Sequence, residues 1–231
     1  MLIAFVSSIG NAISSNKAKS SSLKLKDNEK QVSLIETGGK NFKTVKIGKQ
    51  IWMAENMNES TYRNGDSIPQ VQDAVKWCEL GTGAFCYYEN KAANGAKYGK
   101  LYNWYAVNDP RGLAPKGWHI PNDAEWKQLT DYLGGENEAG TKLKSNSGWN
   151  EYEGKNGNGN NSSGFAGLPG GFRDFFGPFH SMGCCSSWWS STEENMNSRN
   201  GIFRFLSYNC KNVFKDNFTK RRGISVRCIK D

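Results

Sequence analysis

Residues 170–231 contain three blocks, GGFRD (170–174), WWSST (188–192) and GISVRC (223–228), separated by two runs whose composition looks arbitrary. The blocks are rich in Gly, Trp and β-branched residues, which are typical of turns and packed strands. The runs display aromatic and polar side chains, which suit binding better than catalysis. The expected strands are 187–191, 202–208, a short one near Val213, and 224–229. We therefore expect a rigid frame that carries a variable surface.

An aromatic hairpin is expected near the start of the folded region. Residues 44–54 (TVKIGKQIWMA) alternate apolar and polar residues on both sides of Gly48-Lys49, which predicts a hairpin with Trp52 turned inward. Residues 98–107 (YGKLYNWYAV) are consistent with a strand or with a short helix, because periodicity does not separate the two over so few residues.

One clear helix is expected at 123–133. Asn122 or Asp123 supplies its N-cap, and Gly134-Gly135 ends it. Its inward face carries Trp126, Leu129 and Leu133. Because the order is strands, helix, long loops and then a strand-rich end, the fold class is predicted to be α+β, with short antiparallel strands.

Tryptophan dominates the expected core. The chain has eight Trp, nine Tyr and twelve Phe among many polar residues and 26 Gly, which favours an aromatic core wrapped in loops. The tryptophans expected to be buried are Trp52, Trp104, Trp118, Trp126 and Trp188. Residues 145–164 form a Gly/Asn/Ser-rich loop that Trp149 anchors.

The first part of the chain differs from the rest in composition. Residues 1–13 resemble the end of a secretory signal, with Gly10-Asn11-Ala12 as a loose cleavage site, although a disordered start is the alternative. Residues 14–41 are Ser/Lys-rich and are expected to be a linker, which leaves 42–231 as a single domain. No apolar run approaches about 18 residues, so no transmembrane segment is expected.

The net charge of +8 does not by itself indicate a nucleic-acid partner. No Arg-rich helix and no zinc-knuckle spacing accompanies it, so we expect no nucleic-acid binding. Basic residues near the C-terminus, among them Lys211, Lys215 and Arg222, would favour an acidic partner.

Six cysteines in an exported chain suggest a disulfide framework. Cys78 and Cys86 close the short loop CELGTGAFC and are expected to form a disulfide. Cys228 lies in the expected strand ISVRCIKD, where a buried thiol is favoured over a nucleophile. The pairing of Cys184, Cys185, Cys210 and Cys228 stays open.

Neither metal nor cofactor is expected. His119 lies between Trp118 and Ile120, which favours a packed histidine over a general base. Residues 193–195 (EEN) offer oxygen ligands for Ca²⁺, but a charged loop after a strand is usually only solvated.

Six separated motifs together resemble the Fibrobacter succinogenes major paralogous domain. These are TVKIGKQIWMAENMN (44–58), YGKLYNWYAV (98–107), APKGWHIPNDAEWKQL (114–129), GFAGLPGGFRD (164–174), WWSSTE (188–193) and GISVRCIKD (223–231). The resemblance implies a C-type-lectin-like fold, related to formylglycine-generating enzymes, in a secreted or cell-surface protein. It also implies a disulfide partner for Cys228 at the position that Ala114 occupies in this chain.

The C-terminal region also resembles the variable region of proteins that a retroelement diversifies at adenines of Asn codons. After substitution of their adenines, such codons can encode Phe, Cys, Ser, Ile, Arg, Asp or His, but never Lys, Glu, Gln, Met or Trp. The residues that fit this rule are Phe175, Phe176, Phe179, His180, Cys184, Cys185, Ile202, Phe203, Phe205, Cys210, Phe214, Phe218, Arg221 and Arg222. Ordinary drift of surface loops is the alternative explanation.

These observations predict a non-catalytic binding module whose surface at about 172–222 recognises a protein or glycan ligand. The candidate ligand-binding residues are Phe175, Phe176, Phe179, His180, Trp189, Arg199, Phe203, Phe205, Tyr208, Lys211, Phe214 and Phe218. Strand alternation places Phe203 and Phe205 on one face, while Trp189 either lines the binding surface or packs in a second layer. The alternatives are a formylglycine-type copper oxidase and a structural tip subunit of a surface or phage-tail assembly.

Overall fold

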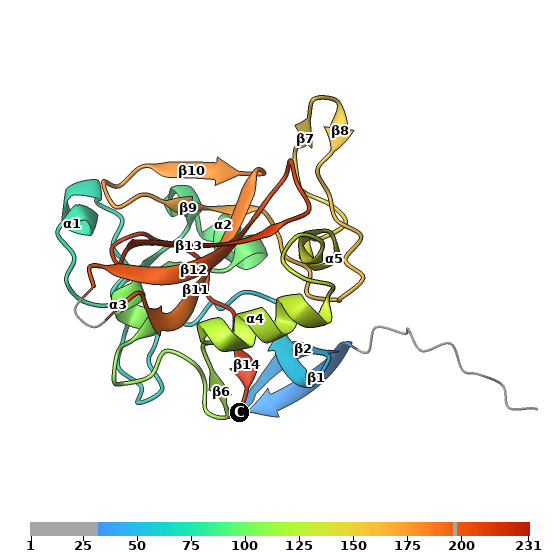
Figure 1. The fold of residues 1–231 in the computed structure, drawn as a ribbon. Helices are drawn as coiled ribbons and strands as arrows, with labels where there is room; N and C mark the ends of the chain where they lie inside the picture. Colours follow the sequence, from blue (N-terminus) through green and yellow to red (C-terminus); the bar gives the residue numbers. More distant parts are fainter. Residues whose placement is uncertain (1–31, 196–197) are drawn as a thin grey trace, which may run out of the picture.

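The computed structural model describes residues 32–195 and 198–231. Within them the chain is a mixed α/β fold in which strands dominate and the helices are short (Figure 1). The predicted signal remnant 1–13 and most of the predicted linker lie outside the described residues. Two five-stranded sheets make up the body, and helix α4 lies between them (Figure 1).

The first sheet has the order β1-β2-β3-β14-β6. Its strands are β1 (Val32–Thr37), β2 (Lys40–Ile47), β3 (Gln50–Met53), β14 (Ile229–Lys230) and β6 (Trp118–His119). The turn at Gly48-Lys49 joins β2 to β3 in an antiparallel pair, which confirms the predicted hairpin, and Trp52 is fully buried. The C-terminal strand is inserted next to this hairpin, with Ile229 facing Trp52 on one side and His119 on the other.

The second sheet has the order β10-β9-β11-β12-β13. Its strands are β10 (Phe179–Met182), β9 (Gly170–Arg173), β11 (Cys185–Glu193), β12 (Asn200–Ser207) and β13 (Val213–Thr219). All neighbours are antiparallel except β9 and β11, which meet in parallel at Gly171 and Ser186. Strand β12 is long and lies between β11 and β13, and its alternate side chains point to the two faces of the sheet.

The remaining elements are small. They are α1 (Ala74–Cys78), β4 (Phe85–Cys86), a 3₁₀ turn (Tyr88–Asn90), α2 (Ala92–Tyr98), β5 (Leu101–Tyr102), α3 (Trp104–Val107), α4 (Asp123–Tyr132), α5 (Ala139–Leu143), β7 (Glu151–Tyr152) and β8 (Lys155–Asn156). The β7–β8 hairpin projects from the body (Figure 1). No helix in the described part of the chain is long and apolar enough to cross a membrane.

Residues 223–228 connect the two sheets. Gly223 exchanges two backbone hydrogen bonds with Arg173 of β9, and Ile224 exchanges two with Tyr102 of β5. Ser225 then accepts a hydrogen bond from the backbone of Trp189. The segment therefore makes single bridges to successive elements, and it becomes a regular strand only at β14, later than the predicted start at residue 224.

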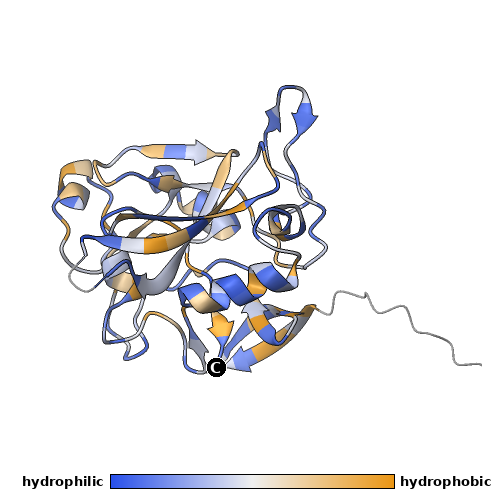
Figure 2. Cartoon of the chain, viewed as in Figure 1, coloured by the Kyte–Doolittle hydropathy of each residue, from blue (hydrophilic) through white to orange (hydrophobic). Residues whose placement is uncertain are grey.

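An aromatic cluster fills the space between the sheets and α4. The ring centroids of Trp52 and Trp126 lie 4.8 Å apart, and those of Phe165 and Trp188 lie 5.3 Å apart. All of the tryptophans that the sequence predicted to be buried are buried, and so is Trp149 in its loop. The exposed side of α4 is mostly hydrophilic (Figure 2), as expected for a helix that covers a core with one face.

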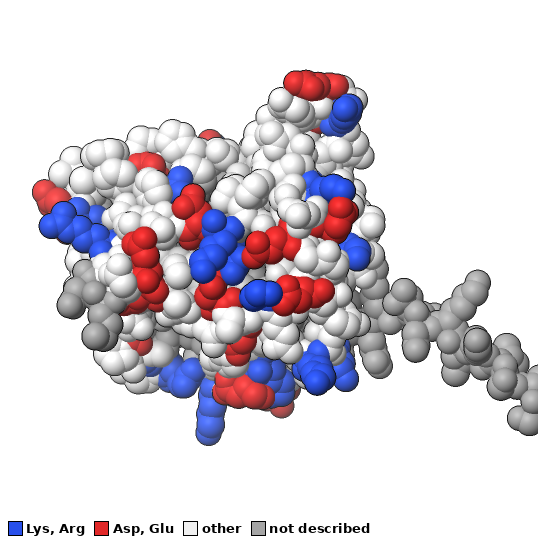
Figure 3. Space-filling model, viewed as in Figure 1, with Lys and Arg blue, Asp and Glu red and all other residues white. Residues whose placement is uncertain are grey.

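Helix α4 begins with a capping box. The side chain of Asn122 accepts from the backbone N–H of Glu125, while the Glu125 carboxylate accepts from the backbone N–H of Asn122. Asp123 pairs with Arg204 of β12 and with Lys215 of β13. Burial opposes ionisation of Asp123, but Lys215 and Arg204 lower its pKa overall. Basic and acidic side chains are accordingly interspersed over α4 (Figure 3).

Three features of the fold depart from or add to the sequence expectations. Strand β1 and the start of β2 lie within 14–41, because the backbone of β1 pairs with β2 although its side chains are largely exposed. The residues that the structure describes contain four α-helices besides α4, all short and held by tertiary packing. The run 98–107 contains both alternatives, a two-residue strand followed by helix α3.

We expect Trp126→Ala to destabilise the fold strongly. The side chain is 1% exposed and contacts three other rings, and truncating a buried aromatic costs about 3–5 kcal/mol. Tyr132→Ala on the same helix is the matched control, since Tyr132 is 66% exposed and should change the unfolding free energy by less than about 1 kcal/mol. Urea titration measures both, and equal midpoints would show that the core lies elsewhere.

The contacts of His119 predict a pH dependence of stability. Burial opposes its charge, but hydrogen bonds to Asp231 and Glu125 at 2.7 and 2.8 Å raise the pKa of His119 overall. The pKa of His119 is therefore higher in the folded protein than its unfolded value of 6.5. The stabilisation that the charged imidazole provides is complete below pH 6.5 and is lost as the pH rises through the pKa of the folded state. The stability advantage of wild type over His119→Gln should therefore be larger at about pH 5.5 than at about pH 8.5. A difference independent of pH would contradict this assignment.

Candidate functional site

One face of the second sheet carries a group of aromatic side chains around an arginine. We call this group the aromatic face. It consists of Phe172, Phe175, Phe176, His180, Phe205, Phe214, Phe218 and Arg222. Phe176 is 66% exposed and Phe214 37% exposed, and His180 is also exposed, so this face is only partly covered by the rest of the chain.

The pairing of β12 with β13 builds one half of the aromatic face. Phe205 lies opposite Phe214, and their rings stack with centroids 4.7 Å apart. Phe203 precedes Phe205 on the same face at 5.8 Å, as strand alternation predicts. Cross-strand aromatic pairs of this kind stabilise a sheet while leaving their outer edges accessible.

Arg222 joins the two halves of the aromatic face. Its guanidinium lies 3.9 Å from the ring centroid of Phe172 and 4.2 Å from that of Phe218, so it is held between two rings. Burial lowers the pKa of Arg222. Its Nε is buried without a partner, and the guanidinium forms no hydrogen bond or ion pair with any residue in 32–195 or 198–231. A charged group in this position can still donate to an acceptor from outside.

The turn between β9 and β10 presents the most exposed phenylalanines. The carboxylate of Asp174 accepts a hydrogen bond from the backbone N–H of Phe176, which fixes the turn. Gly177 has φ of +113°, and a Cβ there would lie 2.5 Å from the Cβ of Ala74. The ring of Phe175 lies 3.8 Å from that of Phe176 and 6.0 Å from that of Phe218, so the turn extends the aromatic face of β13.

Two predicted binding residues belong to the core instead. Trp189 is 0% exposed and donates its indole N–H to the backbone oxygen of Tyr102, so it packs in an inner layer rather than lining the surface. Phe203 is 3% exposed and packs edge-on against Trp189 at 5.9 Å. Both share a face with Phe205, but they belong to the buried cluster that also contains Tyr102 and Trp104.

Four other predicted residues lie away from the aromatic face. Phe179 faces the opposite side of β10 from His180 and packs on Tyr88 at 5.3 Å. Tyr208 packs against Tyr152 of the projecting hairpin, and Lys211 pairs with Glu138. Arg199 is exposed in the connection between β11 and β12. The structure therefore does not combine these four with Phe205 and its neighbours.

Sequence reasoning missed two members of the aromatic face. Phe172 lies within the block GGFRD, which the sequence assigned to the frame, yet alternation along β9 turns it away from the buried Arg173. Arg222 satisfies the adenine-codon rule, but nothing in the sequence around it marks it as a ligand-binding residue. Its position between two rings depends on β9 and β13 being brought together, and no local pattern encodes that.

The predicted disulfide between Cys78 and Cys86 is absent, and all six cysteines are free thiols. Cys86 is 0% exposed and packs among Trp77, Tyr88 and Leu101, and burial raises the pKa of its thiol to about 12. Trp77 enters the same cluster from α1. Because successive helical residues are rotated by about 100°, Cys78 is turned away from it.

No described residues form a group of three or more His, Cys, Asp and Glu side chains suited to a metal ion. The thiols of the adjacent Cys184 and Cys185 contact different partners, since Cys184 accepts from Asn150 and Cys185 lies 3.5 Å from the Ser187 hydroxyl. Cys228 is buried, and burial raises the pKa of its thiol well above the usual range.

Comparison with known proteins identifies the family. The family model described as the Fibrobacter succinogenes major domain matches residues 45–230. This range includes both sheets except β1 and the start of β2, and it includes the whole aromatic face. No curated protein and no solved structure matches the chain. The chain belongs to the Fibrobacter succinogenes major domain family, as its six motifs predicted.

Proposed function

We propose that this protein is a non-catalytic, secreted or surface-displayed binding module with a C-type-lectin-like fold, and that the aromatic face holds its ligand. The observation that carries the proposal is the guanidinium of Arg222, held between Phe172 and Phe218 with no hydrogen-bonding partner in the described chain. An arginine that is positioned by aromatic rings and still has free donors is typical of the residues that dominate binding energy at interfaces.

The two sides of strand β12 support a division between frame and binding surface. On one side Arg204 and Leu206 are 2% and 1% exposed and face α4 and the core. On the other side Phe205 stacks with Phe214, which remains 37% exposed. Exposed aromatic side chains offer a large contact area and lose little rotamer entropy on binding.

A protein ligand suits the aromatic face better than a glycan. Several phenylalanines and one free guanidinium match an apolar surface that includes a carboxylate. The phenyl rings have no polar atoms, so recognition of sugar hydroxyls would depend on Arg222, His180 and nearby backbone groups.

We further propose that a retroelement diversifies the aromatic face. Phe175, Phe176, His180, Phe205, Phe214, Phe218 and Arg222 all satisfy the adenine-codon rule. Side-chain changes at these positions leave the backbone pairing of β12 and β13 intact, because that pairing uses only main-chain groups. A surface of this kind can change its ligand while its frame is preserved.

A photo-crosslinking experiment tests the binding surface. p-Benzoylphenylalanine is introduced at Phe214, which is 37% exposed, or, as a control, at Tyr132 on α4, which is more accessible at 66%. Full-length protein is then irradiated with extracts of the cells or fluids that the protein meets. A captured protein should appear from position 214 and not from position 132, and purified partner should bind wild type more tightly than Phe214→Ala by about 2 kcal/mol. Capture of a glycan would change the ligand class, whereas equal labelling from both positions would contradict the proposed surface.

Sequencing sibling copies of this locus tests diversification. We expect adenine-specific substitutions between residues 170 and 223, with most variation on the aromatic face. The buried Ile202 and Phe203 should vary less, because polar replacements there would enter the core. Substitutions that are independent of adenine, or spread evenly over buried and exposed positions, would contradict diversification and favour ordinary drift.

A further inference from the structure

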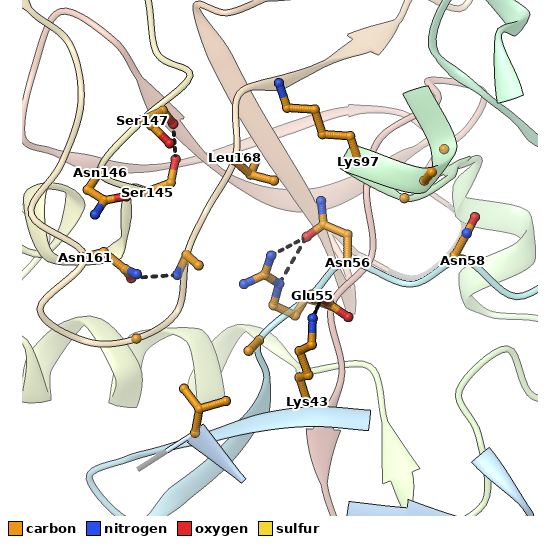
Figure 4. A pocket seen from close by; sticks show the side chains of 18 residues that line it. Lys43, Glu55, Asn56, Asn58, Lys97, Ser145, Asn146, Ser147, Asn161 and Leu168 are labelled. Atoms are coloured by element: carbon orange, nitrogen blue, oxygen red, sulfur yellow. Dashed lines mark hydrogen bonds and ion pairs between the residues drawn. The ribbon is translucent and has the colours of Figure 1, made fainter. Parts of the chain in front are cut away.

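A second candidate site is a cavity of about 520 Å³ that none of the aromatic-face residues lines. Five segments meet around it: β1 and β2, the residues after β3, helix α2, the loop after α5, and the C-terminal segment. Its volume lies within the range of about 300–1,000 Å³ that small-molecule pockets occupy. Figure 4 shows Asn56 at its centre, with Asn146, Ser147 and Asn161 on one side and Lys97 above.

Arg227 lines this cavity from the core. The residue is 1% exposed, and its guanidinium lies 4.0 Å from the ring centroid of Phe165. Its Nε and Nη2 donate to Oδ1 of Asn56 at 3.0 and 2.6 Å, and its Nη1 donates to the backbone oxygen of Phe165. These bonds use three of the five N–H groups of a guanidinium. All three acceptor contacts are with neutral oxygens.

The positive charge of Arg227 has no carboxylate partner among the described residues. The buried Arg204 differs, since Asp123 and Glu136 neutralise it. Glu55 lines the same cavity and favours the charge of Arg227 from beyond ion-pair distance, but its carboxylate pairs with Lys43 at 2.7 Å. A buried charge without a direct ion pair is costly, so an anion in the cavity would relieve that cost.

The rest of the cavity wall suits a small polar ligand. Lys97 is exposed at the rim and adds positive charge, while Asn58, Asn146 and Ser147 supply exposed amide and hydroxyl groups. Helix α2 contributes Ala96, whose short side chain leaves room at the entrance. Amides and hydroxyls of this kind donate to and accept from ligand hydroxyls.

We propose that this cavity binds a sugar-sized polar ligand carrying one carboxylate or phosphate group, with the anion directed at Arg227 and Lys97 and the hydroxyls at the Asn and Ser side chains. The site is independent of the aromatic face. The protein would thus hold a small anionic ligand in its frame besides any partner on its variable surface.

Isothermal titration of the full chain with three probes tests this proposal. Glucuronate supplies a carboxylate, glucose 6-phosphate supplies a phosphate, and glucose is the neutral control. At least one anionic probe should bind about tenfold or more tightly than glucose, because an ion-assisted hydrogen bond is lost without the anion. The anionic probe that binds more tightly shows whether the site prefers a carboxylate or a phosphate. If neither anionic probe binds more tightly than glucose, the proposal is wrong.

Variants at the rim keep the test independent of folding. Ala96→Trp should block the entrance and lower the affinity for the anionic probe about tenfold or more. Ala93→Trp is the matched control, since Ala93 is exposed on the same helix but does not line the cavity. Lys97→Glu should also weaken binding, whereas Lys46→Glu, an equal charge change outside the cavity, should not. If the affinity is the same in Ala96→Trp as in Ala93→Trp, the probe binds elsewhere and the site is refuted.

Discussion

The backbone path of residues 223–229 is the constraint on which the rest of the structure depends. Every residue of this segment is buried, and its main-chain groups bond in turn to β9, β5, β11 and the residues after β3 before β14 pairs with β3 and β6. A buried backbone must satisfy its polar groups within the protein. Because each partner belongs to a different element, the segment fixes the two sheets relative to each other.

Three arginines show how position in this frame determines what a residue can do. Arg204 on the inner side of β12 is neutralised by two carboxylates and serves to attach α4 to the sheet. Arg222 lies on the outer side and is positioned by phenyl rings, and Arg227 is buried beside a cavity with neutral oxygens as acceptors. An arginine whose charge is neutralised by carboxylates of the protein, such as Arg204, has a structural role. Where no carboxylate pairs with the guanidinium, as at Arg222 and Arg227, we infer a binding role.

Sequence reasoning was most successful where local chemistry decides the structure. The Gly48-Lys49 hairpin, the cap of α4 and the buried tryptophans follow from turn residues, capping residues and hydrophobicity, all of which act over short distances. Alternation also grouped Phe203 with Phe205. It did not reveal that Phe203 is buried against Trp189, because burial depends on tertiary packing. The cavity beside Arg227 was missed for the same reason, since five separate segments form it.

The aromatic face and the cavity differ in how freely their residues can change. The side chains of Phe214 and Phe176 have no hydrogen-bonding groups, so their loss removes only apolar contacts at the surface. Asn56 Oδ1, by contrast, accepts hydrogen bonds from Trp188 as well as from Arg227, and its amide donates to the backbone oxygen of Tyr98. Replacing Asn56 would leave several buried donors unsatisfied at once. A surface that varies and a cavity that is fixed can therefore coexist, because side-chain hydrogen bonds of Asn56 and Arg227 hold the cavity wall, whereas the side chains of the aromatic face form none with the described residues.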